Sequence, residues 1–201
     1  ELVLDTRDLT IATVEARDDK GNWHEVEHAL ADRDPILGQK LTIPIGDTQP
    51  AAVRIRYHTA PTASGLQWLT KEQTLGKQAP FMFSQSQAIH ARSWVPLQDT
   101  PAVRFTYTAN LKVPKNLLAL MSAENPQSTN TNGRYHFEMK QPIPSYLMAI
   151  AIGRLKFEAI SERAGVYAEP ERVKAAVAEF TDTEKMIEAT ETLYGAYRWG
   201  R

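Results

Sequence analysis

Apolar and polar residues alternate along much of the chain before residue 140, which is the pattern of strands with one buried face. The longest alternating run extends from Val103 to Val113 and ends at Pro114, and a shorter run covers residues 53–58. Three more strands show the same pattern, around Leu9 and Ile11, around Leu41, Ile43 and Ile45, and from Tyr135 to Met139. Because Pro44 has no N–H for a strand ladder, it favours a sheet edge for the strand that contains it.

Helical periodicity is confined to the C-terminal part of the chain. Pro170 suits the first position of a helix, and apolar positions over residues 173–180 then share one face. A second helix is predicted to start at Thr181, with Glu184 completing a capping box, and to end at Gly195. Strands followed by helices indicate a β domain and then the start of a different domain.

The composition is typical of a soluble globular protein. The 201 residues are 42% hydrophobic and 23% charged, with 23 basic and 24 acidic side chains and a net charge of -1. This balance argues against nucleic acid or a membrane surface as a partner, and no apolar run approaches the ~20 residues of a membrane span. The absence of cysteine excludes disulfides, thiolate metal sites and a cysteine nucleophile within the chain.

One short segment spells a zinc motif. Residues 24–28 read H-E-x-x-H, and Asp47 follows where some zinc peptidases place an acidic ligand. Two histidines four positions apart reach one zinc ion only on a helix, because in a strand they are ~13 Å apart. The segment directly follows the turn at residues 18–22 and lacks an apolar helical face. We therefore interpret His24 and His28 as a chance match on a solvated, charged strand and predict no metal site here.

Residues 83–101 mix polar side chains, aromatic rings and proline in a pattern typical of neither a strand nor a helix. Gln85 and Gln87 are the candidates for binding, because a neutral amide both accepts and donates, which suits a peptide backbone or an amine. The alternative is a buried loop whose amides satisfy nearby backbone groups. His90 is interpreted as a structural residue, and no nucleophile turn or phosphate-binding loop accompanies it.

Six stretches carry a specific pattern when they are taken together: residues 66–70 (LQWLT), 83–92 (FSQSQAIHAR), 96–101 (PLQDTP), 142–150 (PIPSYLMAI), 180–184 (FTDTE) and 197–200 (YRWG). In this order they resemble the N-terminal domain of M1-family zinc aminopeptidases, in particular the leukotriene A4 hydrolase-like branch. The resemblance implies a mainly β, saddle-like domain with several sheets over residues 1–155. Residues 156–201 would then form a short α+β segment that begins a thermolysin-like catalytic domain, cut short at Arg201.

The same resemblance implies a function. The parent enzyme would be a cytoplasmic zinc metalloaminopeptidase that removes N-terminal residues from peptides. Gln85, Ser86, Gln87 and Ala88 would line its peptide site, with Gln87 near the free amino terminus of the substrate.

The catalytic motifs of the family, G-x-M-E-N and then H-E-x-x-H, would follow Arg201 in the missing catalytic domain. This chain alone is therefore expected to have no catalytic residue, no zinc and no activity. The alternative from a different class is a freestanding β-rich interaction module without catalysis, in which Gln85 and Gln87 contact a partner protein.

Overall fold

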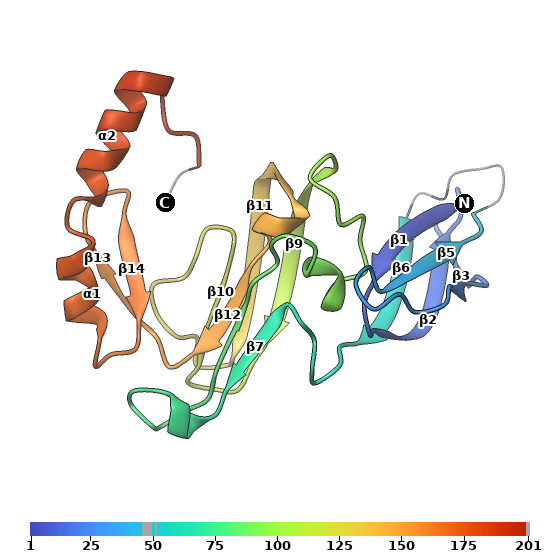
Figure 1. Cartoon of the computed structure of the whole chain (residues 1–201), viewed down its shortest axis with the longest axis horizontal. Coiled ribbons are helices and arrows are strands. Elements are labelled where there is room, and N and C mark those ends of the chain that lie inside the picture. Colours follow the sequence, from blue (N-terminus) through green and yellow to red (C-terminus); the bar gives the residue numbers. More distant parts are fainter. Residues whose placement is uncertain (46–49, 51, 200–201) are drawn as a thin grey trace. The chain divides into compact units, whose positions relative to one another are not determined.

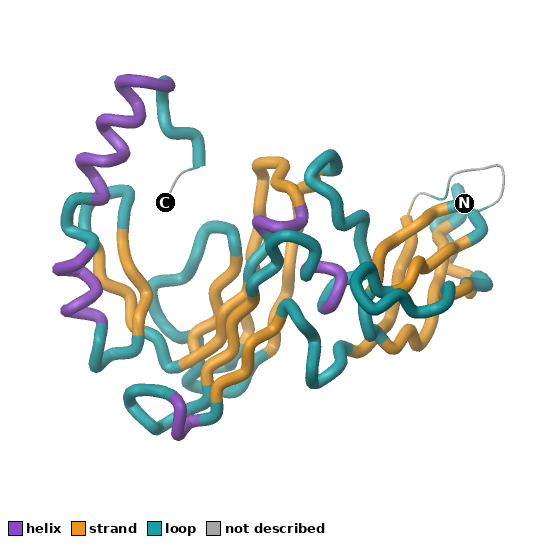
Figure 2. Tube along the Cα trace, in the orientation of Figure 1, coloured by secondary structure: helices purple, strands orange, loops and turns teal. Residues whose placement is uncertain are grey.

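The computed structural model describes residues 1–45, 50 and 52–199, so Asp47 lies outside the described residues. Strands in several sheets make up most of the ordered elements, and the two α-helices follow them near the C-terminus (Figures 1 and 2). The chain divides into two compact units, each built from separate stretches. The first comprises residues 1–67, 84–104 and 143–148, and the second comprises residues 68–83, 105–142 and 149–201.

The first unit contains two antiparallel three-stranded sheets. One has the order β1 (Leu2–Thr6), β5 (Gln39–Ile43), β4 (Ala29–Leu30), and the other β3 (Trp23–Glu25), β2 (Thr10–Arg17), β6 (Ala52–His58). Val14 from β2 packs with Leu41 and Ile43 from β5, and all three are fully buried. The sequence correctly predicted β2 and β6, but the edge position of the third strand was wrong. β5 is the middle strand of its sheet, because Pro44 comes after its last residue and takes no part in the ladder.

The second unit contains most of the residues of a four-stranded sheet and a two-stranded ribbon, and the whole of a hairpin. The sheet has the order β10 (Leu118–Met121), β12 (Ile150–Gly153), β8 (Phe81–Ser84), β7 (Leu66–Leu69). The ribbon pairs β11 (Arg134–Pro144) with β9 (Arg104–Lys112), and the hairpin pairs β13 (Lys156–Ala159) with β14 (Gly165–Ala168). Phe137 and Leu118 are the least exposed side chains in the hydrophobic core of the second unit, together with Ala119. Both long strands predicted from alternation are confirmed as β9 and β11, and β11 continues to Pro144.

Two helices occur in the region where helical periodicity predicted them, α1 (Val173–Glu179) and α2 (Thr183–Tyr194). Both start later than predicted. Thr181 does not cap α2, because its hydroxyl donates to the carbonyls of Val177 and Ala178 at the end of α1. Gly195 does end α2, with a φ of 90° that glycine adopts without steric cost.

The predicted capping box also fails because Glu184 has other partners. Its carboxylate accepts from the Ser161 hydroxyl and from Arg163 Nε, the latter at 2.7 Å. Arg163 also donates to both carboxylate oxygens of Glu191 at 2.9 Å. These bonds raise the pKa of Arg163 above its ordinary value. The bonds of Ser161 and Arg163 fix α2 against the loop of the β13–β14 hairpin.

Short 3-10 turns occur at Lys71–Gln73, Ala91–Ser93 and Ser145–Leu147.

Candidate substrate-binding loop

The residues predicted to bind substrate lie directly after β8, in a loop of the first unit. Gln85, Gln87 and Ala88 are exposed, whereas Ser86 between them is 2% exposed. The peptide bond between Gln87 and Ala88 is cis. The loop thus presents the two amide side chains and one methyl group to solvent, and it turns the serine into the protein.

Ser86 fixes this loop to its surroundings. Its Oγ donates to the carbonyl of Met148 at 2.8 Å and accepts from Trp94 Nε1 at 3.2 Å. Its own carbonyl accepts from the His90 N–H at 2.9 Å, which closes the turn that follows. Because these groups are buried and paired, the Ser86 side chain acts as an internal support and leaves the exposed surface to its neighbours.

Gln85 and Gln87 differ in what their side chains do. Gln85 Oε1 accepts from the backbone N–H of Gln87 at 3.1 Å. The side-chain amide of Gln87 has no hydrogen-bond partner among the described residues, so its carbonyl and its N–H groups are available to a ligand. The alternative was a buried loop in which both side-chain amides hydrogen-bond to nearby backbone groups. Gln85 makes such a bond, whereas the side chain of Gln87 makes none among the described residues.

Gly65 lies where the chain before β7 passes close to the residues that follow β8. Its carbonyl accepts from Gln85 N at 2.9 Å, and its N–H donates to Ser93 Oγ at 2.8 Å. A Cβ at this position would lie 2.5 Å from the carbonyl oxygen of His90, closer than real Cβ contacts allow. A glycine is therefore required for this approach of the two backbones.

His90 sits in a polar cluster whose contacts are typical of a structural histidine. Its Nδ1 lies 2.8 Å from Ser64 Oγ and 3.2 Å from Arg7 Nη1. A guanidinium only donates, so Nδ1 is the acceptor in the contact with Arg7. Burial lowers the pKa of the Arg7 guanidinium, and the nearby cation of Arg92 lowers it further.

A buried ion pair lies behind the loop and was not anticipated from the sequence. Arg92 Nε donates to Asp99 Oδ2 at 3.0 Å, and the two side chains are 7% and 0% exposed. The other carboxylate oxygen of Asp99 accepts from Ser145 Oγ at 2.6 Å. This network joins the glutamine segment to the Pro-Ile-Pro-Ser-Tyr-Leu segment. The separate resemblance of both segments to one family was the only signal in the sequence that related them.

The two buried arginines also hold a loop of residues 34–38. Arg92 Nη1 donates to the Leu37 carbonyl at 2.7 Å, and Arg7 Nη2 donates to the carbonyl of Ile36. The carboxylate of Asp34 accepts from the N–H groups of Leu37 and Ile36, which lowers its pKa. These hydrogen bonds link the two arginines to the loop of residues 34–38 and support the glutamine loop from behind, although Arg7 Nε is buried without a partner among the described residues.

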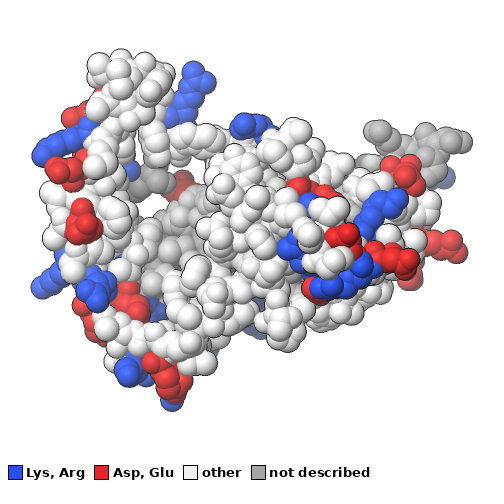
Figure 3. Space-filling model, viewed as in Figure 1, with Lys and Arg blue, Asp and Glu red and all other residues white. Residues whose placement is uncertain are grey.

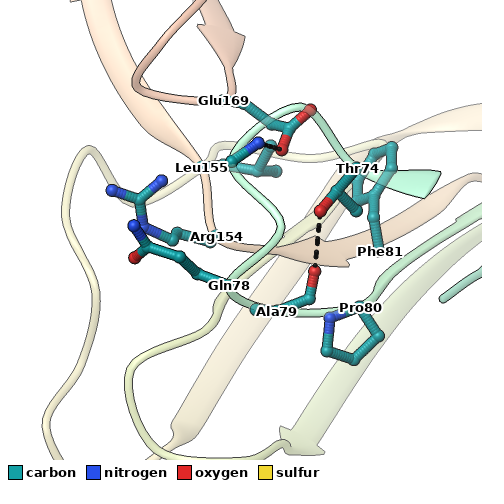
Figure 4. Close-up of a pocket in the computed structure, with 9 residues that line it drawn as sticks. Thr74, Gln78, Ala79, Pro80, Phe81, Arg154, Leu155 and Glu169 are labelled. Atoms are coloured by element: carbon teal, nitrogen blue, oxygen red, sulfur yellow. Dashed lines mark hydrogen bonds between the residues drawn. The ribbon is translucent and has the colours of Figure 1, made fainter. Parts of the chain in front are cut away.

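The second unit has a small pit beside the loop of residues 74–81, with Arg154, Leu155 and Glu169 on its other side (Figure 4). Thr74 Oγ1 donates to the Ala79 carbonyl at 3.2 Å, and Glu169 accepts from the backbone N–H of Gly76 at 3.2 Å. The pit has no room for a water molecule, and the side chains of Thr74 and Glu169 are already bonded to backbone groups of the loop beside it. It is a packing detail of this unit.

The H-E-x-x-H segment lacks the helix that zinc binding requires. β3 ends at Glu25, residues 26–28 are neither helix nor strand, and His24 and His28 are both exposed. The predicted strand is confirmed over Trp23–Glu25 and does not extend to His28. Within the described residues, no group of three or more His, Asp or Glu side chains is arranged to hold a metal ion.

Charged side chains of both signs are intermixed on the face seen in Figure 3. This matches the balanced composition and shows no large area of one sign on that face. No helix in the described part of the chain is both long and apolar enough to cross a membrane.

Comparison with known proteins identifies the class. A family model described as the peptidase M1 N-terminal domain matches residues 1–147. The chain therefore belongs to the M1 peptidase family and contains its N-terminal domain. Within that family it falls in the leukotriene A4 hydrolase-like branch.

Three relatives are similar to this chain along nearly its whole length. Leukotriene A-4 hydrolase from Xenopus laevis is 43% identical over 100% of this chain and 34% of its own length. Leucine aminopeptidase 2 from Yarrowia lipolytica is 41% identical over 98% of this chain and 30% of its own length. The structure of native leukotriene A4 hydrolase from Saccharomyces cerevisiae matches with a TM-score of 0.88 at 37% identity, over 100% of this chain and 30% of that one. The chain spans about a third of the length of these relatives.

Proposed function

We propose that this chain is the part of a zinc aminopeptidase that forms one wall of its substrate cleft. The parent enzyme removes N-terminal residues from peptides in the cytoplasm. The observation that carries the proposal is the exposed amide of Gln87, which has no partner among the described residues and projects from a loop that is otherwise held by hydrogen bonds. In a chain of the M1 family, such a group suits the free amino terminus of a peptide.

The chemistry of the contact follows from the groups involved. A peptide amino terminus is an ammonium group that only donates, and the side-chain carbonyl of Gln87 accepts. The bond is charge-assisted and therefore stronger than a bond between neutral groups. A carboxylate elsewhere in the enzyme supplies the opposite charge, while Gln87 gives direction without adding charge. Ala88 adds a small apolar contact, and Gln85 and Ser86 hold the loop.

We place the domain boundary near Leu155, with residues 156–201 as the start of the catalytic domain. α2 supports this division, because none of its residues is buried and its side chains Met186 and Leu193 are 66% and 72% exposed. An isolated helix of this length is marginal in water. We assign the covering surface to the rest of the catalytic domain, and without it the chain is inactive.

Zinc in the parent enzyme does not fit the residues present here. His24 and His28 lie on a strand and a loop, and no third ligand accompanies them among the described residues. We assign the zinc ligands and the catalytic carboxylate to the catalytic domain of the parent enzyme. Reading the coding sequence there tests the proposal: G-x-M-E-N followed by H-E-x-x-H supports it, whereas a stop codon directly after Arg201 favours the interaction module.

Replacement of both His24 and His28 by alanine tests the zinc assignment. In the full-length protein we expect the variant to retain about one zinc ion per chain, because a single zinc site binds one ion. We also expect its aminopeptidase activity to be unchanged. Metal analysis by mass spectrometry and a peptide-hydrolysis assay measure the two quantities. Loss of zinc in the variant would show that the motif at residues 24–28 binds metal.

A further inference from the structure

The two glutamines of the loop are both exposed, yet their side chains are used differently. Gln85 Oε1 points at the backbone N–H of Gln87, at a distance of 3.1 Å. A side-chain amide has one carbonyl oxygen and one NH₂ group on opposite sides of the same carbon. With its oxygen directed at the loop backbone, Gln85 uses its acceptor inside the protein.

Three consecutive residues of the loop are each held by a different group. The N–H of Gln85 donates to the Gly65 carbonyl at 2.9 Å, and the hydroxyl of Ser86 donates to the Met148 carbonyl at 2.8 Å. Gln87 has only the bond from its own N–H to the Gln85 side chain, among the described residues. The orientation of Gln87 therefore depends on Gln85 more than on any other side chain.

We propose that Gln85 is a positioning residue, whose side-chain carbonyl fixes the backbone of Gln87 and so directs the Gln87 amide toward the amino terminus of the substrate. This inference rests on the proposed function. It requires an acceptor at position 85 and no donor. If Gln85 instead contacted the substrate through its NH₂ group, the donor would be the part that matters.

Two substitutions separate these roles in the full-length enzyme. Gln85→Met keeps the length of the side chain and removes the acceptor, and we expect it to raise KM for a peptide about 2- to 10-fold with little change in kcat. Gln85→Glu keeps an oxygen that accepts from the Gln87 N–H. Its KM should stay within about twofold of the unsubstituted enzyme or fall, since a hydrogen bond to a charged acceptor is at least as strong.

The hydrogen bond itself is measured without the reaction. In full-length protein labelled with ¹⁵N-glutamine, Gln85→Met should move the amide proton signal of Gln87 upfield, and Gln85→Glu should not. Gln98→Met is the matched control, because Gln98 is an exposed glutamine in the same segment, and it should leave both KM and the Gln87 signal unchanged.

Two results would overturn the inference: a Gln85→Glu enzyme impaired as much as Gln85→Met, or a Gln87 amide signal unaffected by Gln85→Met. Failure of the proposed function looks different. In that case Gln87→Ala leaves the kinetics unchanged, while the amide signal still responds to position 85.

Discussion

Replacement of Asp99 by alanine is expected to destabilise the protein by about 3–5 kcal/mol, the usual cost of leaving one charge of a buried pair without its partner. Arg92 would keep its buried guanidinium, which is 7% exposed, but would lose the carboxylate that accepts from both its side chain and its backbone N–H. The carboxylate of Asp5, 3.5 Å from Arg92 Nη1, is more exposed and would be the acidic group left beside it. Ser145 would lose its acceptor as well. Urea unfolding followed by circular dichroism measures the change in the free energy of unfolding.

Two further variants serve as controls for the Asp99→Ala measurement. Arg33→Ala breaks an ion pair with Asp8 in which both side chains are exposed, and it should have a much smaller effect because solvent screens such pairs. The double substitution Arg92→Met with Asp99→Leu should recover part of the loss, since it removes both charges. If Asp99→Ala were as stable as Arg33→Ala, the buried pair would not be what supports the loop.

Replacement of Gln87 by alanine in the full-length enzyme is expected to lower kcat/KM for peptides with a free amino terminus by about 10- to 100-fold. A hydrogen bond to a charged group contributes about 1.5–3 kcal/mol, and each 1.4 kcal/mol is a factor of about ten. Folding should be unaffected, because the side-chain amide of Gln87 has no partner within the described residues. Steady-state peptide hydrolysis measures the effect.

The matched control is Gln98→Ala. Gln98 is exposed and lies in the same segment as Gln87, so its removal tests for a general effect of losing a surface amide there. Its kinetics should equal those of the unsubstituted enzyme. Unchanged kinetics in Gln87→Ala, or equal losses in both variants, would remove the assigned role of Gln87.

The strands were predictable because their information is local. A period of two over residues 103–113 is enough to predict β9, whatever packs against it. The start of α2 was not predictable in the same way. Thr181 and Glu184 have the spacing of a capping box, but Arg163 lies 21 residues before Glu184 and draws its carboxylate away. A local motif fails where a distant charge offers a stronger partner.

The candidate substrate-binding loop was likewise predictable only in part. Spacing and residue type singled out Gln85 and Gln87, and the exposure of both agrees with a binding role. Sequence reasoning grouped Ser86 with them, whereas its side chain is buried and bonded to Trp94 and Met148. It also missed the Arg92–Asp99 pair, because no periodicity marks a charged residue that the fold will bury. Contacts between distant segments decide which polar residues face inward.

A crystal structure of the full-length protein with a bound tripeptide would show whether Gln87 binds the amino terminus of the substrate. We expect the Gln87 side-chain oxygen to lie about 2.7–3.2 Å from the terminal nitrogen of the peptide, within hydrogen-bond distance. A peptide bound with its terminal nitrogen in contact with other groups, and with the Gln87 amide still facing solvent, would contradict the role assigned to Gln87.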